Sequence, residues 1–166
     1  MKNKISIFTL IFFLLNLLCF AGQSAEKENS IMLKNFKTDL CTSYPEGTRK
    51  EPRLWAHCCI LHDMSYWVAG NKKDLKRADI FLKECVTKVA GAFQGSLMYL
   101  GIRAGHAFPI KSKYRWGWAW QKSRKRYARL SKLERDYVLS IIYDQGDISP
   151  DLLDEFIQFR FFELSD

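Results

Sequence analysis

The first strong pattern of apolar and polar positions beyond the N-terminal region is that of two adjacent amphipathic helices. Pro52 suits the first turn of a helix, because its missing N–H has no partner there, and no breaker follows before Gly70. Asn71, with an acid three places on, suits an N-cap. The sequence therefore predicts helices over residues 51–69 and 72–90.

Residues 92–105 are a candidate third helix that Gly95 and Gly101 weaken, and residues 130–143 and 150–163 have helical apolar spacing. Ser149 and Pro150 form a good cap and first turn for the last of them. Residues 105–118 mix aromatic, basic, Gly and Pro residues and predict an irregular loop. Because no run indicates a strand, we expect a mainly α fold in which a helical hairpin is followed by further helices.

The connection between the first two helices is so short that they must fold back as an antiparallel hairpin. Facing residues in such a hairpin have position numbers with a nearly constant sum. This register sets His62 opposite Asp79 and Cys58 opposite Cys85. The hairpin thus predicts one polar pair and one disulfide from the same geometry.

The N-terminal region has the order of a secretory signal peptide. A short basic start precedes an apolar run over residues 5–20, and small residues follow at Ala21 and Ala25. The run is shorter than the roughly 20 residues that a membrane span needs. We predict a signal peptide over residues 1–25, cleaved after Ala21 or Ala25, and a single exported domain, secreted or periplasmic, over residues 26–166.

Export places the remaining cysteines in an oxidising compartment, where an even count indicates disulfides. With Cys58 paired to Cys85 by the hairpin register, Cys59 is left for Cys41, upstream of the helix. A zinc site formed by these cysteines and His62 is the alternative. Export argues against it.

One face of the first helix carries the residues most suited to chemistry, Cys59, His62, Asp63 and Tyr66. Asp79 interrupts an apolar stripe on the second helix and needs a partner there, which the register supplies as His62. In such a pair the acid fixes the imidazole tautomer, and the free ring nitrogen becomes a general base. Asp63 is suited to hold a cation that orients a substrate and polarises its carbonyl. A satisfied polar pair without catalysis is the alternative.

The run Cys58-Cys59-Ile60-Leu61-His62-Asp63 resembles the C-C-x-x-H-D signature of the secreted phospholipase A2 superfamily. A second helix follows with Asp79 and Cys85 at matching positions, so the resemblance covers residues 41–86. It implies a calcium-dependent hydrolase that cleaves the sn-2 ester of a glycerophospholipid with water deprotonated by His62, without a covalent acyl-enzyme. It also implies the two disulfides that the hairpin predicts.

The same resemblance implies roles for individual residues. Asp79 is the acid behind the catalytic histidine, Tyr66 bonds the catalytic pair, and Asp63 is the calcium carboxylate. Further calcium ligands would be backbone carbonyls of the preceding loop, with candidates at Cys41, Thr42, Tyr44 and Gly47. The family's two glycines just after the cysteine are missing here, and Gly47 is the only glycine nearby.

Charge is unevenly distributed over the second half of the chain. The net charge is +8, yet residues 111–133 hold nine Lys or Arg and no acid, while residues 134–166 hold nine acids and two Arg. Interleaved aromatic and basic side chains suit an anionic phospholipid membrane. The residues expected at that surface are Trp116, Trp118, Trp120, Arg124, Lys125 and Arg126. The alternatives are tryptophans in the core with charges that are solvated or paired with the acidic tail, and nucleic acid, which an exported protein is not expected to bind.

Two functions follow from these patterns. The first is a secreted phospholipase A2-like hydrolase that uses calcium. The second is a non-catalytic lipid- or protein-binding module that retains the hairpin as a scaffold. His57 and His106 enter neither, because neither has a predictable partner, and each is expected to be a structural or surface residue.

Overall fold

The computed structural model describes residues 32–107, 113–146 and 148–162, and these residues are mainly helical. No strand occurs within these ranges, which confirms the predicted mainly α class. The predicted signal peptide and its two cleavage positions lie outside the described residues. Among the helices described, none is long and apolar enough to cross a membrane.

Helix α2 (Ala56–Val68) begins later than predicted. Residues 51–55 form turns instead, and the Trp55 N–H donates to the Glu46 carbonyl (2.9 Å). This bond folds the chain back on itself before the helix starts. Pro52 therefore lies in a turn rather than in the first helical turn, and the predicted start of this helix was wrong.

Helix α3 (Lys72–Ala90) begins where the sequence predicts. The Asn71 side chain accepts hydrogen bonds from the N–H groups of Lys73 (2.7 Å) and Asp74 (3.2 Å). In return, the Asp74 carboxylate accepts from the Asn71 N–H (2.7 Å). This capping box satisfies backbone donors that have no partner within the helix.

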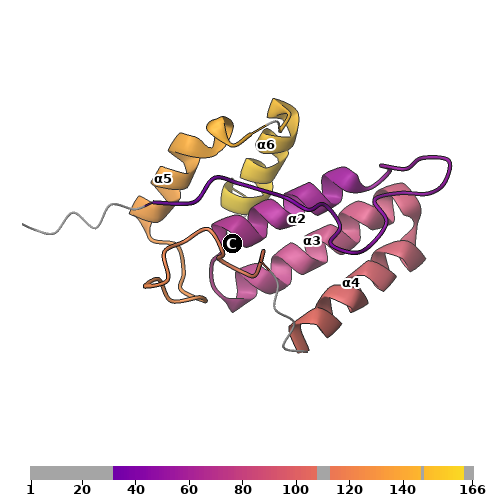
Figure 1. Ribbon diagram of the computed structural model, residues 1–166, viewed down its shortest axis with the longest axis horizontal. Coiled ribbons are helices and arrows are strands. Elements are labelled where there is room, and N and C mark those ends of the chain that lie inside the picture. The colour runs from indigo at the N-terminus through magenta and orange to yellow at the C-terminus, as the bar shows by residue number, and fades with distance from the viewer. Residues whose placement is uncertain (1–31, 108–112, 147, 163–166) are drawn as a thin grey trace, which may run out of the picture. The chain divides into compact units, whose positions relative to one another are not determined.

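Helices α2 and α3 are antiparallel and lie side by side (Figure 1). One disulfide, Cys58–Cys85, joins the two helices, and a second, Cys41–Cys59, joins α2 to the preceding loop. Both predicted pairings are confirmed. Each disulfide stabilises the fold by roughly 2–4 kcal/mol, chiefly by restricting the unfolded chain.

Helix α4 (Ala92–Ala107) follows α3 after a turn at Gly91, whose φ of 88° lies in the region that favours glycine. It packs closely against α3. Gly95 permits this approach, because a Cβ atom there would lie 2.3 Å from the Thr87 Oγ1 atom and 2.5 Å from the Lys83 carbonyl oxygen. The predicted third helix is confirmed and continues past its expected end.

The C-terminal part contains helix α5 (Lys132–Ile141), the 3-10 turn η1 (Ile142–Asp144), helix α6 (Pro150–Ile157) and the π-helical turn η2 (Gln158–Phe162). Both helices lie where predicted, and Pro150 occupies the first turn of α6. The buried Arg160 connects this part to the hairpin. Its guanidinium donates to the Asp74 carboxylate (3.3 Å) and to the Ala69 carbonyl oxygen.

Two tryptophans of the basic segment lie in the interior. Trp116 and Trp120 are 3% and 8% exposed, and their indole N–H groups donate to the carbonyl oxygens of Gly70 (2.9 Å) and Val68 (2.7 Å). These carbonyls follow or end α2 and lack helical partners. The expectation that the two rings face a membrane is therefore wrong, and the alternative that they belong to the core is confirmed.

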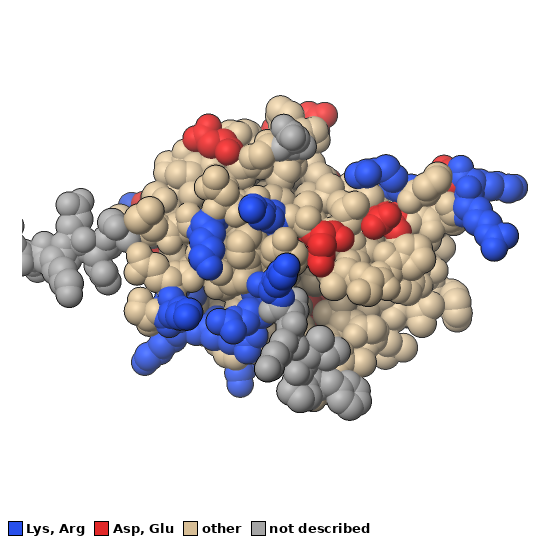
Figure 2. Space-filling view, viewed as in Figure 1, with Lys and Arg blue, Asp and Glu red and all other residues tan. Residues whose placement is uncertain are grey.

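The cationic residues of the same segment divide into two groups. Arg124 is turned inward, because its guanidinium pairs with Glu134 (2.5 Å) and stacks on the Trp120 ring. It pairs with the acidic tail, so the expected membrane contact is wrong for this residue. Lys125 and Arg126 are exposed, Trp118 is half-buried, and Figure 2 shows Lys and Arg side chains gathered over this part of the surface.

Candidate active site

A cleft of about 1110 Å³ lies where α2, α3 and α4 meet the loop of residues 40–44 and the segment of residues 114–127. Most of the predicted site residues line it, namely Cys41, Thr42, Tyr44, His62, Asp63 and Tyr66. Gly47 does not line it and packs instead against the backbone of residues 51–54. The hairpin and the disulfide at Cys41 thus gather most of the predicted site into one cleft.

The polar pair predicted from the hairpin register is present, with the His62 Nε2 atom 3.1 Å from the Asp79 Oδ1 atom. Asp79 is fully buried, and the His62 side chain is 11% exposed. The Tyr66 hydroxyl donates to the same carboxylate oxygen (2.9 Å). Because a carboxylate only accepts, His62 carries its proton on Nε2, and the neutral ring leaves Nδ1 free to accept.

Helix α4 adds two residues to this network that the sequence did not predict. Arg103 Nη1 donates to the other carboxylate oxygen of Asp79 (3.2 Å), and His106 Nε2 lies 2.6 Å from the Tyr66 hydroxyl oxygen. His106 therefore has a defined partner, which the sequence alone did not indicate. The available signal was the antiparallel register of α3 and α4, which places Arg103 opposite Asp79.

Hydrogen-bond chemistry assigns the protons around Tyr66. Its single hydroxyl hydrogen goes to Asp79, so His106 must donate from Nε2 to the Tyr66 oxygen. The unprotonated Nδ1 atom of a neutral His106 then accepts from Arg103 Nη1 (3.4 Å). Burial lowers the pKa of His106, which favours this neutral form. A chain of hydrogen bonds thus runs from Arg103 through His106 and Tyr66 to Asp79.

Asp79 is held as a permanent negative charge. Burial raises the pKa of this carboxyl, but the hydrogen bonds from His62 and Tyr66, together with the positive charge that His62 or His106 carries once it is protonated, outweigh burial, so the pKa lies below its ordinary value. Burial and the neighbouring Asp79 raise the pKa of Tyr66, which stays a neutral donor. At neutral pH the carboxylate is therefore available to stabilise a positive charge on His62.

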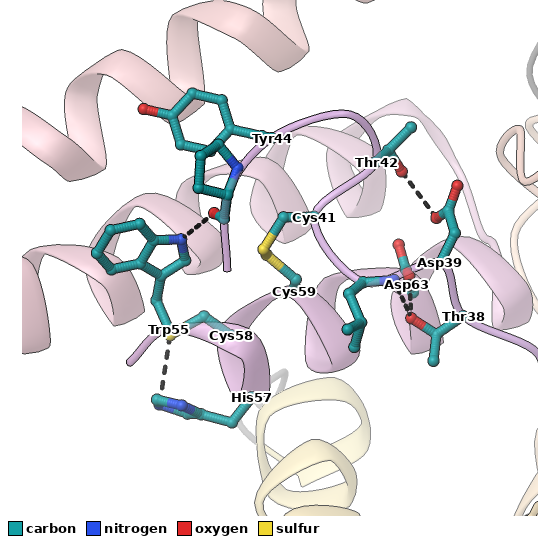
Figure 3. Close-up of a disulfide and its surroundings, with 12 residues drawn as sticks. Thr38, Asp39, Cys41, Thr42, Tyr44, Trp55, His57, Cys58, Cys59 and Asp63 are labelled. Atoms are coloured by element: carbon teal, nitrogen blue, oxygen red, sulfur yellow. Dashed lines mark hydrogen bonds between the residues drawn. A yellow bond between two sulfur atoms is a disulfide. The ribbon is translucent and has the colours of Figure 1, made fainter. Parts of the chain in front are cut away.

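Asp63, the next residue along α2, has the opposite electrostatics. Burial raises the pKa of its carboxyl to about 7; His62 and Thr38 oppose this effect and Asp39 adds to it. The Asp63 Oδ2 atom accepts a hydrogen bond from the Thr38 hydroxyl (2.5 Å), as Figure 3 shows. Thr38 lies 25 residues away in a segment without regular secondary structure, and no sequence pattern indicated it.

The loop beside Asp63 makes tight turns without glycine. Leu40, Thr42 and Ser43 have φ values of 61°, 34° and 63°, in the region that favours glycine. The Cys41–Cys59 disulfide joins this loop to α2 (Figure 3). The missing glycines therefore do not prevent left-handed turns here, and backbone strain of this kind concentrates at ligand sites and active sites.

Asp63 and the loop beside it offer oxygen atoms of the kind that could hold a hard cation. Calcium prefers carboxylate and backbone carbonyl oxygens, and a cation would compensate the negative charge whose burial raises the pKa of Asp63. The residues that would hold it are Asp63 and, through their backbone, Cys41, Thr42 and Tyr44, all of which line the cleft.

A zinc site does not fit the cysteines. The four cysteines beyond the predicted signal peptide, Cys41, Cys58, Cys59 and Cys85, are in disulfides, so none of them offers a thiolate. His57, Cys58 and Cys85 lie close enough to share a metal ion, but both sulfurs belong to one disulfide. The His57 Nε2 atom lies 3.4 Å from the Cys58 sulfur, outside the cleft, which is consistent with the structural role expected for His57.

Charges along the cleft are mainly positive. Its described lining contains a single acid, Asp63, and five cationic side chains, Lys72, Lys76, Arg103, Arg115 and Arg126. Helix α4 contributes an apolar wall that includes Leu97, Met98 and Leu100. The cleft therefore complements a molecule with an anionic group and an apolar chain.

These observations define a disulfide-linked helical protein with a buried His–Asp pair beside a cationic cleft. Comparisons with family models, with curated proteins and with solved structures find no match for this chain. Its function is therefore proposed from its own geometry.

Proposed function

We propose that the chain is a secreted or periplasmic phospholipase A2-like hydrolase that cleaves the sn-2 ester of glycerophospholipids with calcium. One observation carries the proposal. The His62 Nε2 atom donates to Asp79, which leaves Nδ1 as the acceptor, and both His62 and Asp63 line the cleft. The two disulfides support export, because such bonds are typical of oxidising compartments.

In the proposed reaction, His62 Nδ1 takes a proton from a water molecule as the water oxygen attacks the ester carbonyl carbon. Asp79 stabilises the resulting imidazolium, while Tyr66 and Arg103 fix the carboxylate. His62 then gives the proton to the departing glycerol oxygen, which yields a fatty acid and a lysophospholipid. Calcium, when bound at Asp63, supplies positive charge that polarises the ester carbonyl.

The cleft supports a phospholipid as substrate. Its cationic side chains suit a phosphate group, and its α4 wall suits an acyl chain. We propose an anionic phospholipid membrane as the partner surface, with Lys125 and Arg126 among the exposed cations that attract it.

Fatty acid release from ester-linked phosphatidylglycerol vesicles tests the proposal. The wild type should release fatty acid in calcium and not in EGTA. His62→Ala should lower the rate by about 10²- to 10⁴-fold, because the general base is lost. His57→Ala is a matched control on the same helix and should retain the rate. No release by the wild type, or an equal rate from His62→Ala, contradicts the proposal.

The non-catalytic module is the second candidate, and one contact favours it. The Thr38 hydroxyl already bonds one oxygen of Asp63, so this carboxyl has a partner without a metal ion. A non-catalytic module would bind vesicles in the same assay but release no fatty acid with or without calcium.

A further inference from the structure

The outer face of α4 is apolar and exposed. Phe93, Leu97 and Leu100 are 82%, 43% and 63% exposed, and their spacing puts them on one side of the helix. Arg103 is the only Lys, Arg, Asp or Glu among the 16 residues of α4, although a surface helix normally carries charges on its outer face. Phe93, Leu97 and Leu100 together form what we term the α4 stripe.

The α4 stripe continues into the cleft, since Leu97 and Leu100 also line it. The remaining lining supplies cations, including Lys76, Arg115 and Arg126. In Figure 2 the visible surface over the first part of α4 is tan, whereas blue side chains gather over residues 113–131. Contiguous exposed apolar side chains mark interaction sites, and apolar side chains beside cations are typical of surfaces that enter anionic membranes.

We propose that the α4 stripe inserts into an anionic phospholipid bilayer and so places the mouth of the cleft against the lipid. The claim that docking delivers a substrate to the cleft rests on the proposed function, whereas the claim that the stripe binds a bilayer does not. Charge complementarity selects this occupant over a second copy of the chain. A symmetric contact between two copies would bring the same cations face to face.

Diether phosphatidylglycerol vesicles test the docking, because ether lipids have no ester to cleave and binding is read apart from hydrolysis. The double variant Phe93→Gln/Leu100→Gln removes two exposed apolar side chains. Leu133→Gln on α5 is the matched control, since Leu133 is 67% exposed and lies outside the cleft. In co-sedimentation, the double variant should bind at least about tenfold more weakly than the wild type, and the control should bind equally well.

Phosphatidylcholine vesicles should also bind the wild type more weakly than phosphatidylglycerol vesicles do, because the cations then lack anionic lipid. Undiminished binding by the double variant, an equal loss in Leu133→Gln, or no preference for anionic lipid overturns the proposal. The proposal is also overturned if the wild type binds no vesicles and instead forms a dimer that is lost in the double variant. If the wild type binds vesicles but does not cleave ester lipids, the docking proposal is supported and only the proposed hydrolase activity is contradicted.

Discussion

Two buried carboxylates on neighbouring helices, Asp79 and Asp63, have opposite electrostatics. Asp79 accepts hydrogen bonds from His62, Tyr66 and Arg103, and its pKa lies below the ordinary value. Asp63 accepts one from the Thr38 hydroxyl, and burial raises its pKa to about 7. Both side chains are buried, so the different donors around each carboxylate decide the direction of the shift.

This difference indicates different roles: Asp79 is a framework residue, which positions His62, and Asp63 is the proposed ligand of a cation. Three donors satisfy Asp79, whose charge then fixes and supports His62. Asp63 has a single neutral hydroxyl donor, which leaves a buried negative charge that a cation would compensate. Asp79 therefore needs no further partner, whereas Asp63, the single acid in the described lining of the cleft, is the carboxylate at which we propose calcium.

The largest expected effect is on the pH dependence of stability in EGTA. Asp63 has a pKa of about 7 in the folded chain against 3.8 in the unfolded chain, so the folded state binds the proton more tightly. This contribution to stability is present at low pH and is lost as pH rises from about 4 to about 7. Relative to Asp63→Asn, the wild type should lose roughly 4 kcal/mol of unfolding free energy over this window.

Urea denaturation at a series of pH values measures this difference. Asp136→Asn is the control, because Asp136 forms an exposed ion pair with Lys132. Its profile should parallel that of the wild type. If the Asp63→Asn profile also runs parallel, the buried charge on Asp63 is compensated and the contrast with Asp79 fails.

The charge on Asp79 is expected to stabilise the folded chain, whereas the charge on Asp63 destabilises it, and the effect of removing Asp79 is smaller. Asp79→Ala should lower the free energy of unfolding by about 3 kcal/mol at neutral pH, because it leaves the buried donors of His62 and Tyr66 without an acceptor. Asp136→Ala should change stability by no more than about 0.5 kcal/mol. Chemical denaturation of both variants checks this, and similar small losses in the two would show that Asp79 is not a framework residue.

The sequence predicted the hairpin half of the fold well. The short connection and the helical spacing predicted the register. The register determined the Cys58–Cys85 disulfide, which left Cys59 for Cys41, and the meeting of His62 with Asp79. The start of α2 was missed, because tertiary hydrogen bonds turn the chain at Pro52 despite its suitability for a first helical turn.

The rest of the site depends on contacts that local patterns do not encode. The contact between Gly95 and Thr87 sets the antiparallel register of α3 and α4. The same register, followed to the end of α4, places Arg103 and His106 at the site. Thr38 bonds Asp63 from a segment that has no regular secondary structure and no periodic pattern. The aromatic and basic composition of residues 111–133 does not distinguish an exposed ring from the buried rings of Trp116 and Trp120.

Calcium-dependent thermal unfolding tests the contrast between the two carboxylates most directly. Calcium should raise the Tm of the wild type by several degrees, because the proposed site at Asp63 exists only in the folded chain and a ligand bound there stabilises it. The rise should be smaller at pH 5.5 than at pH 8, because Asp63 must lose its proton to bind. Asp136→Asn should show the same rise and Asp63→Asn none. A wild-type Tm unmoved by calcium, or an equal rise in Asp63→Asn, would contradict the assignment of Asp63 as the calcium ligand.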